Sequence, residues 1–428
     1  MAAERLAQAA QGKEVYRQLD VFTRVLSYIE NNYVEEVNEK KLIQGAIKGM
    51  VGTLDPHTLF MPQEIFKDMK VDTSGEFGGL GIELTSRMQV KNGVRSEVLM
   101  VVAPIDDTPA ARAGVKAGDV IFKIDGESTA EMDLVTAVSR MRGPAGSKVV
   151  LTILREGFTE ARDLILIRDH IRIVSVEGRL HEGGYGYVKI KSFQEQTDRY
   201  LKRVLDELRR QHKGELKGLV LDLRNNPGGL LDQAVKVSDR FLAGGLVIVT
   251  TKGRGGRHVE EEKSHERDTE APYPMIVLVN GGSASASEIV AGALQDHGRA
   301  VIMGRATFGK GSVQTLIELE DGSGLKLTIA RYYTPKGRSI QEKGIQPDVA
   351  VKTAEDGGPR EVDLRNHFRS EDGKPASKPS PEEASVVVPE SKPGEDELLK
   401  TALDYLRTWQ IFKATAPSSA GSPPARVP

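Results

Sequence analysis

Apolar residues at helical spacing open the chain. Between residues 14 and 35 they recur every three to four positions, as on one face of an α-helix. These positions are Tyr16, Leu19, Phe22, Val25, Leu26 and Ile29. A second helical run follows from Lys41 to Val51. We therefore expect a helical N-terminal region over residues 1–69, which belongs to the core or joins copies of the chain.

Between residues 70 and 170 the pattern changes to short apolar runs typical of β-strands. The runs are Gly81 to Leu84, Val98 to Val102, Asp119 to Ile124 and Val149 to Leu154. A short helix fits Thr108 to Ala113, and a longer one fits Met132 to Met141. The stretch therefore predicts a compact β-barrel with two helices, inserted before the next domain.

From residue 185 to 350, apolar strands alternate with helical segments. The predicted strands are Tyr185 to Ile190, Leu219 to Leu223, Met275 to Val279 and Ala300 to Met303. The predicted helices are Asp198 to Gln211, Leu230 to Leu242 and Ser285 to Asp296. Continuous apolar strands that alternate with helices indicate an α/β layered core, which we place at residues 171–352. The chain as a whole is then a multidomain α+β protein.

The C-terminal part has a different composition. Residues 369–397 are rich in Ser, Pro, Glu and Lys, and such a segment cannot bury enough apolar surface to order itself. An apolar helical stripe follows, at Leu398, Leu399, Ala402, Leu403, Leu406 and Trp409. We expect a flexible linker over residues 353–397, an amphipathic helix over 398–413 that docks on this chain or a partner, and a tail over 414–428.

Composition narrows the possible functions. The 428 residues include 59 basic and 61 acidic ones, so no surplus of positive charge favours nucleic acid as a partner. The absence of cysteine excludes disulfides, thiol nucleophiles and thiolate zinc sites, and the eight histidines form no HExxH motif for a metal. No apolar run is long enough to span a bilayer, and the opening residues contain no signal h-region.

A glycine-rich loop, Gly79-Leu80-Gly81-Ile82, stands at the start of a predicted strand. Its backbone N–H groups can hold a terminal carboxylate while the bound peptide adds a strand to the sheet. Residues 110–119 (AARAGVKAGD) and 119–126 (DVIFKIDG) resemble the corresponding segments of PDZ domains. We therefore expect residues 70–170 to bind a polypeptide with a free C-terminus, with Ile82 shaping a pocket for the last side chain. Arg112 contacts the peptide or the next domain, or is simply solvated.

Three segments of the α/β region carry candidate chemistry: residues 222–229 (DLRNNPGG), 280–288 (NGGSASASE) and 308–314 (FGKGSVQ). Each follows a predicted strand, where α/β folds place their active sites. In the second segment a turn of small residues enters a helix, whose free N–H groups suit a developing oxyanion. One of Ser283, Ser285 and Ser287 can be a nucleophile and another a helix cap, and the residues alone leave that choice open.

A serine nucleophile needs a base, and Lys310 is the candidate because no histidine lies in a comparable turn. Burial away from acidic partners lowers a lysine pKa enough for the amine to accept a proton. Gln314, four residues later, lies on the same face and can orient a neutral amine without raising its pKa. Gly228 or Gly229 can supply one oxyanion donor and Ala286 the other, since glycine permits close backbone approach.

These segments resemble the carboxyl-terminal processing peptidases, also called tail-specific proteases. Further marks are residues 333–341 (YTPKGRSIQ) and 344–348 (GIQPD), and the resemblance covers roughly residues 15–350. It implies that the middle serine, Ser285, is the nucleophile, that Lys310 is the base 25 positions later, and that Gln314 is the third member. Asp296 matches an acidic residue near the site whose role is structural.

The resemblance also implies a ClpP/crotonase-like protease core that works as an endopeptidase near substrate C-termini, with no metal or cofactor. It implies a periplasmic or otherwise exported protein, gating by the PDZ domain, and a homo-oligomer formed through terminal helices. An adaptor or regulator protein is a further possible partner.

Two other functions compete with this interpretation. Residues 304–310 (GRATFGK) nearly spell a phosphate-binding P-loop, but Gly311 replaces the Mg²⁺-binding hydroxyl and the following residues look extended. A PDZ scaffold without catalytic activity is the second alternative, although Ser285 and Lys310 are both present. A nucleotide-binding assay distinguishes the first alternative from a peptidase. Incubation with an unstructured polypeptide distinguishes the second, because a scaffold would not cleave it.

Overall fold

The computed structural model describes residues 2–91, 94–105, 107–130, 132, 134–155, 158–352, 360–370, 386–387 and 396–415. Most of the expected linker and the end of the tail lie outside these residues. Within them, no helix is both long and apolar enough to cross a membrane.

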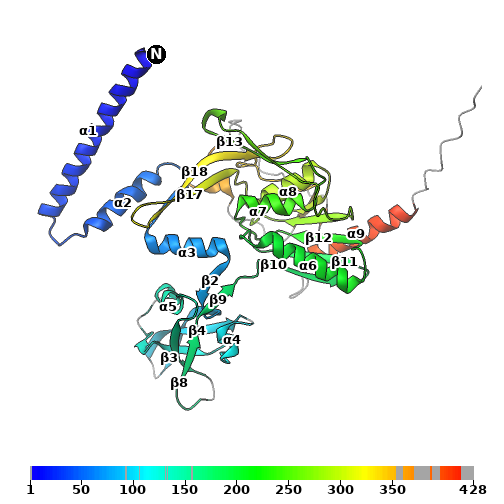
Figure 1. Ribbon diagram of the computed structural model, residues 1–428, viewed down its shortest axis with the longest axis horizontal. Helices are drawn as coiled ribbons and strands as arrows, with labels where there is room; N and C mark the ends of the chain where they lie inside the picture. Colours follow the sequence, from blue (N-terminus) through cyan, green and yellow to red (C-terminus); the bar gives the residue numbers. More distant parts are fainter. Residues whose placement is uncertain are drawn as a thin grey trace, which may run out of the picture.

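The N-terminal region is helical, as the spacing of its apolar residues predicts. It contains α1 (Ala2–Asn32), α2 (Glu39–Val51) and α3 (Gln63–Ser74). Helix α1 projects away from the rest of the molecule (Figure 1). Its apolar stripe is uncovered, with Tyr16 73%, Leu19 54% and Phe22 43% exposed. The sequence pattern did not indicate α3, which leads into the next domain.

The second region is built on a six-stranded antiparallel sheet with the order β3-β4-β5-β7-β8, in which β6 also pairs with β5. Its elements are β3 (Ile82–Lys91), β4 (Val94–Pro104), α4 (Pro109–Arg112), β5 (Val120–Ile124), β6 (Glu127–Ser128), α5 (Leu134–Met141), β7 (Lys148–Leu154) and β8 (Arg162–Ile167). Leu80, Ile121 and Leu151 lie in its buried core. The path of paired strands is open, whereas the sequence predicted a barrel, and β3 is an edge strand.

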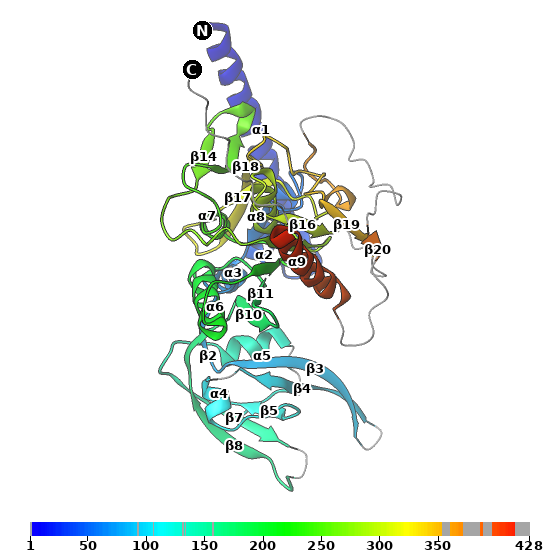
Figure 2. The ribbon, with the colours of Figure 1, turned by 90° about the vertical axis from the view of Figure 1, so that its right-hand side faces the viewer.

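A pair of strands joins this region to the rest of the chain. β2 (Glu76–Gly79) pairs antiparallel with β9 (Asp169–Arg172). An ion pair of 2.6 Å between Arg142 and Asp68 ties the turn after α5 to α3. In both views the region lies at the opposite end of the molecule from α1 (Figure 1, Figure 2).

The largest region is layered around a seven-stranded sheet with the order β10-β11-β12-β15-β16-β19-β20. Its strands are β10 (Val176–His181), β11 (Tyr185–Ile190), β12 (Gly218–Asp222), β15 (Met275–Val279), β16 (Val301–Gly304), β19 (Val349–Lys352) and β20 (Val386–Val387). All neighbours are parallel except β10 and β11. The structure thus has the predicted α/β layers.

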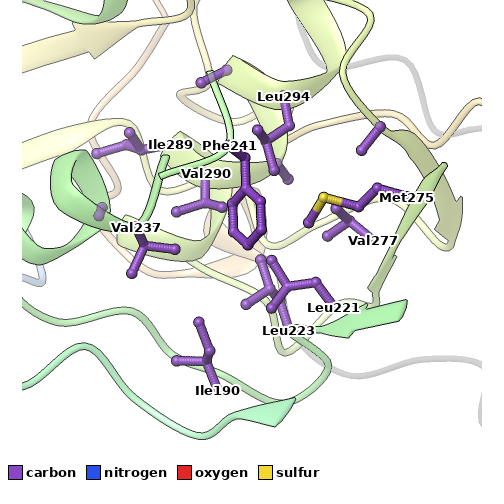
Figure 3. Packing of buried hydrophobic residues seen from close by; sticks show 14 of the residues in the cluster. Ile190, Leu221, Leu223, Val237, Phe241, Met275, Val277, Ile289, Val290 and Leu294 are labelled. Atoms are coloured by element: carbon purple, nitrogen blue, oxygen red, sulfur yellow. The ribbon is translucent and has the colours of Figure 1, made fainter. Parts of the chain in front are cut away.

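Helices cover both faces of this sheet because alternate strand residues point to opposite sides. α6 (Thr197–His212), α7 (Leu231–Asp239) and α8 (Ala286–Asp296) pack on the face that carries Leu221 and Val277. Figure 3 shows this core around Phe241. α9 (Glu397–Thr415) packs on the other face, against Val220 and Ile276, so the C-terminal helix docks on its own chain.

A second sheet lies beside the first and has the order β1-β18-β13-β14, with β17 also paired to β18. Its strands are β1 (Leu59–Met61), β13 (Val247–Gly253), β14 (Glu260–Lys263), β17 (Ser312–Glu318) and β18 (Gly324–Tyr333), and short 3-10 turns occur at η1 (Arg254–Gly256) and η2 (Glu361–Asp363). In this sheet β18 pairs with β1, from the N-terminal region, on one edge and with β17, the strand that follows Lys310, on the other.

Candidate active site

The three segments that the sequence singled out meet at one edge of the seven-stranded sheet. They follow β12, β15 and β16, which are parallel neighbours, so their carboxyl ends lie together. Ala284 N donates to Asn226 O at 3.0 Å, and Phe308 N donates to Ser283 O at 3.0 Å. The loops therefore form one contiguous surface.

The structure distinguishes the three serines. Ser283 Oγ donates to Leu223 O at 2.8 Å, and Ser287 Oγ donates to Asn226 O at 2.9 Å. Both of these side chains are completely buried, whereas Ser285 is partly exposed. Ser285 stands at the N-cap of α8 with φ 55° and ψ −114°. Its hydroxyl is thus the one of the three that can meet a substrate.

A buried carboxylate, Glu288, holds the serine loop and the lysine loop together. Its Oε2 accepts from Ser285 N at 2.8 Å and from Lys310 N at 3.0 Å. Its Oε1 accepts from Gly309 N at 2.8 Å and from the Thr307 hydroxyl. Sequence reasoning assigned Glu288 no role, although the Ser-x-x-Glu spacing at a helix start is the signature of a capping box.

The environment of Lys310 makes its neutral form easier to reach than it is in water. Burial lowers the pKa of Lys310 to about 8; the nearby Lys326 acts in the same direction, and Glu361, Glu288 and Asp55 oppose it. Within the described ranges, the Lys310 ammonium makes no hydrogen bond or ion pair. The expectation of an unpaired lysine agrees with this geometry, but three carboxylates act on it from a distance.

Tyr332 is a second residue that the sequence did not indicate. Its hydroxyl donates to Lys310 O and also interacts with the Ser285 side chain. Burial raises the pKa of Tyr332 well above its ordinary value, so the phenol is a neutral donor. Its place on β18 follows only from the pairing of distant strands, which no local pattern reports.

Gln314 lies on β17, and its Nε2 donates to Ser312 O at 3.1 Å and to Ser312 Oγ at 2.9 Å. No hydrogen bond joins Gln314 to Lys310 in the part of the chain that the structure covers.

The structure also bears on the P-loop alternative for residues 304–310. Ser312–Glu318 is a strand, so no helix follows Lys310 as a P-loop requires. Residues 304–310 therefore do not form a P-loop.

Backbone donors surround Ser285. A Cβ on Gly228 would lie 2.8 Å from Ser285 Cβ and 2.9 Å from Ala286 N, so glycine is required there. Gly228 N is used, because it donates to Asn226 Oδ1 at 2.9 Å. Gly229 N and Ala286 N have no acceptor among the described residues.

Asp296 lies at the end of α8 away from Ser285. Arg338 pairs with its carboxylate there, which is consistent with a structural role.

The PDZ-like loop has the backbone geometry that the glycines suggest. Gly81 has φ 74°, and a Cβ there would lie 2.4 Å from Thr108 side-chain atoms. Leu80 is buried, Gly79 ends β2 and Ile82 begins the edge strand β3. The loop therefore borders the strand to which a peptide could add.

Arg112 of α4 lies near the first residue of this loop, because its partner Asp169 pairs with Gly79 across β2 and β9. Its guanidinium pairs with Asp169 of β9 at 2.9 Å and donates to Asp107 O at 2.7 Å. Both charged side chains are more than half exposed, at 58% and 52%, so the pair is a surface contact at the connecting strands.

Comparison with known proteins agrees with this architecture. Residues 184–351 match peptidase family S41, residues 100–155 a PDZ domain, and residues 2–65 the activating protease CtpB N-terminal domain. A carboxy-terminal-processing protease of Bartonella bacilliformis is 48% identical and covers 79% of this chain and 76% of its own length. Carboxy-terminal processing protease CtpA of Bacillus subtilis is 37% identical, over 78% of this chain and 69% of its own.

The solved structure of a photosystem II D1 C-terminal processing protease is 31% identical, with a TM-score of 0.44, and covers 77% of this chain and 92% of that one. The two relatives are similar enough in sequence, over enough of their length, to assign this chain to their family, and the matched S41 core agrees. The chain belongs to the carboxy-terminal-processing proteases of peptidase family S41 and is a serine-type peptidase that carries a PDZ domain.

Proposed function

We propose that this chain binds the C-terminal tail of a polypeptide in its PDZ domain and cleaves the polypeptide near that tail, with Ser285 as nucleophile and Lys310 as base. One observation supports the assignment above the others. The backbone N–H groups of Ser285 and Lys310 donate to the same oxygen of Glu288, at 2.8 and 3.0 Å, while the lysine amine is buried and unpaired.

The proposed reaction begins when neutral Lys310 takes the proton of the Ser285 hydroxyl. Ser285 Oγ attacks the scissile carbonyl carbon, and the N–H groups of Gly229 and Ala286 donate to the oxyanion. The Lys310 ammonium then protonates the leaving amine, which departs and leaves an acyl-enzyme. Lys310 next deprotonates a water that attacks the ester, and Ser285 recovers its proton. Gln314 would orient the amine after turning from Ser312.

The PDZ domain supplies substrate selection in this proposal. A substrate tail would add to the edge strand β3, with its carboxylate at the loop Gly79 to Ile82. The domain joins the core through β2, β9 and α3, so a bound tail could fix its position and gate the site. We also propose assembly through terminal helices, export from the cytoplasm and an optional adaptor as expectations of the family.

The test is cleavage of an unstructured polypeptide that ends in an apolar residue, with fragments identified by mass spectrometry. We expect cuts near the C-terminus, slower cleavage when the terminal carboxyl is amidated, and loss of at least about a thousandfold in kcat/KM for Ser285→Ala and Lys310→Ala. Lys400→Ala removes an exposed lysine and should cleave normally. Wild-type activity in Lys310→Ala would exclude the lysine as base.

A further inference from the structure

The turn between α2 and β1 is connected, through Glu361, to the loop 308–311 that carries Lys310. Asp55 is buried, and its Oδ1 accepts from His57 N and Thr58 N at 2.9 Å each, while its Oδ2 accepts from Thr58 Oγ1 at 2.7 Å. β1 begins at the next residue, and its Leu59 pairs with Lys326 of β18. The turn is therefore fixed both internally and by strand pairing.

His57 in this turn holds a carboxylate from the other end of the chain. Its Nε2 lies 3.0 Å from Oε1 and 2.8 Å from Oε2 of Glu361. The Glu361 side chain is completely buried, and that of His57 is 15% exposed. Because water cannot compensate a buried carboxylate, Glu361 depends on the donors that surround it.

Gln341 links Glu361 to Gly311, the residue that follows Lys310. Gln341 Nε2 donates to Glu361 Oε1 at 3.0 Å, and Gln341 Oε1 accepts from Gly311 N at 2.9 Å. Glu361 N donates to Phe308 O at 3.1 Å. His57, Glu361 and Gln341 therefore form a connected set of contacts with the loop that carries Lys310, separate from those of Glu288.

Each carboxylate that acts on Lys310 is occupied by other donors. Glu288 accepts four hydrogen bonds, Asp55 binds its own turn, and Glu361 binds His57 and Gln341. Besides these three carboxylates, the charged or titratable groups that act on or contact Lys310 and Glu361 within the described residues are Lys326, His57 and Tyr332. Among the described residues two side chains, those of His57 and Gln341, donate to the Glu361 carboxylate, so loss of His57 would leave it the least satisfied of the three.

We propose that His57 is a positioning residue for the reaction: it holds Glu361 so that this carboxylate does not pair with Lys310, and the lysine stays available as a base. The inference rests on the proposed role of Lys310. If His57 is removed, Glu361 turns to the ammonium and stabilises its charged form, so a higher pH is needed for activity. If Glu361 is made neutral, the opposite shift follows.

The experiment is the pH profile of kcat/KM for wild type, His57→Phe, Glu361→Gln and the double variant. We expect the step that Lys310 titrates to move up by about one pH unit in His57→Phe, which lowers kcat/KM at pH 7 about tenfold, with recovery at high pH. Glu361→Gln should move the step down. The double variant should follow Glu361→Gln, because the carboxylate that His57 restrains is gone.

The chain offers a matched control in His367, which pairs with the largely buried Glu342 at 2.7 Å. His367→Phe should leave the profile where it is. An unshifted profile in His57→Phe, or an upward shift that persists in the double variant, would refute the positioning role. A wild-type profile without this step would instead refute Lys310 as base. A folded fraction that stays constant over the pH range lowers kcat/KM without moving the step, and circular dichroism over the same range shows whether it is constant.

Discussion

At the residue scale, a buried lysine and a buried carboxylate set the pH dependence that the proposed mechanism predicts. Burial lowers the pKa of Lys310 to about 8 and raises the pKa of Glu288 to about 7. All four hydrogen bonds of Glu288 are donated to it, so the ionised carboxylate is the form that fits. The proposed base must be neutral and its organising carboxylate charged, and both conditions fail as the pH falls.

Activity should therefore fall in two steps on acidification. We expect log kcat/KM to decline with a slope of about one below pH ~8, where Lys310 gains a proton, and of about two below pH ~7, where Glu288 does as well. Steady-state cleavage from pH 5 to 10 measures both slopes. A profile that is flat from pH 6 to 9 would contradict the involvement of either group.

Glu288→Gln should remove the second step and weaken the site. The amide places N–H donors against backbone N–H groups, so we expect a loss of about 1–3 kcal/mol in unfolding free energy and a large loss of kcat. Chemical denaturation and the pH profile measure the two effects. A Gln variant that kept wild-type stability would mean that the carboxylate charge is dispensable for joining the loops.

The sequence indicated the local chemistry of the site but not its long-range partners. The Ser-rich helix start and the glycine-flanked Lys310 stand out as segments, and the family resemblance selected Ser285. His57 and Glu361 are 304 positions apart, and only the pairing of β1 with β18 and the return of the chain at η2 bring them together. No periodicity in either segment carries that information.

At the element scale, helix α9 is joined to the segment that leads into the proposed oxyanion turn. Arg224 donates to Asp396 through two nitrogens at 3.0 and 2.6 Å, and to the buried Asp222 at 2.6 Å. Asp396 Oδ1 also accepts from Leu399 N at 3.0 Å and so caps α9. The start of the C-terminal helix therefore contacts the segment 222–229 directly, through Arg224.

Asp396→Ala should destabilise the protein by about 1–3 kcal/mol, since it removes a helix cap and the two hydrogen bonds that the partly buried Arg224 donates to Asp396. Asp404→Ala, which breaks an exposed ion pair with Arg407, should cost less than about 0.5 kcal/mol. Chemical denaturation of both variants gives the comparison. Equal effects would mean that the contact with Arg224 is only a surface pair.

Elements with strong periodicity were predictable, and those defined by pairing were not. The predicted helix Asp198 to Gln211 is α6 (Thr197–His212), and the strand Met275 to Val279 is β15. β1 has three residues and β18 is only half buried along most of its length, so neither shows a clear pattern. Their sheet exists because distant segments pair with one another.

At the scale of the whole molecule, the chain has a core between two projecting parts. The PDZ domain lies at one end and α1 at the other (Figure 2). An uncovered row of large apolar side chains on a helix is costly in water unless it meets a partner. The proposed assembly of several copies would cover α1.

Leu19→Glu together with Phe22→Glu should therefore shift the protein toward monomers. Light scattering after size-exclusion chromatography measures the mass. Arg24→Glu changes charge at a position that is 73% exposed on the same helix and should leave assembly unchanged. A wild-type protein that is monomeric at all accessible concentrations would refute assembly through α1.

The backbone of Ser285, the proposed nucleophile, limits which other residues could take over that role. A side chain branched at Cβ is strongly disfavoured at φ 55°, so threonine cannot replace this serine without rebuilding the turn. Cysteine is unbranched and fits the same conformation. Descendants of this architecture therefore have an open route to a thiol protease and a closed route to a threonine protease, a constraint that comes from one dihedral angle rather than from the chemistry of the hydroxyl.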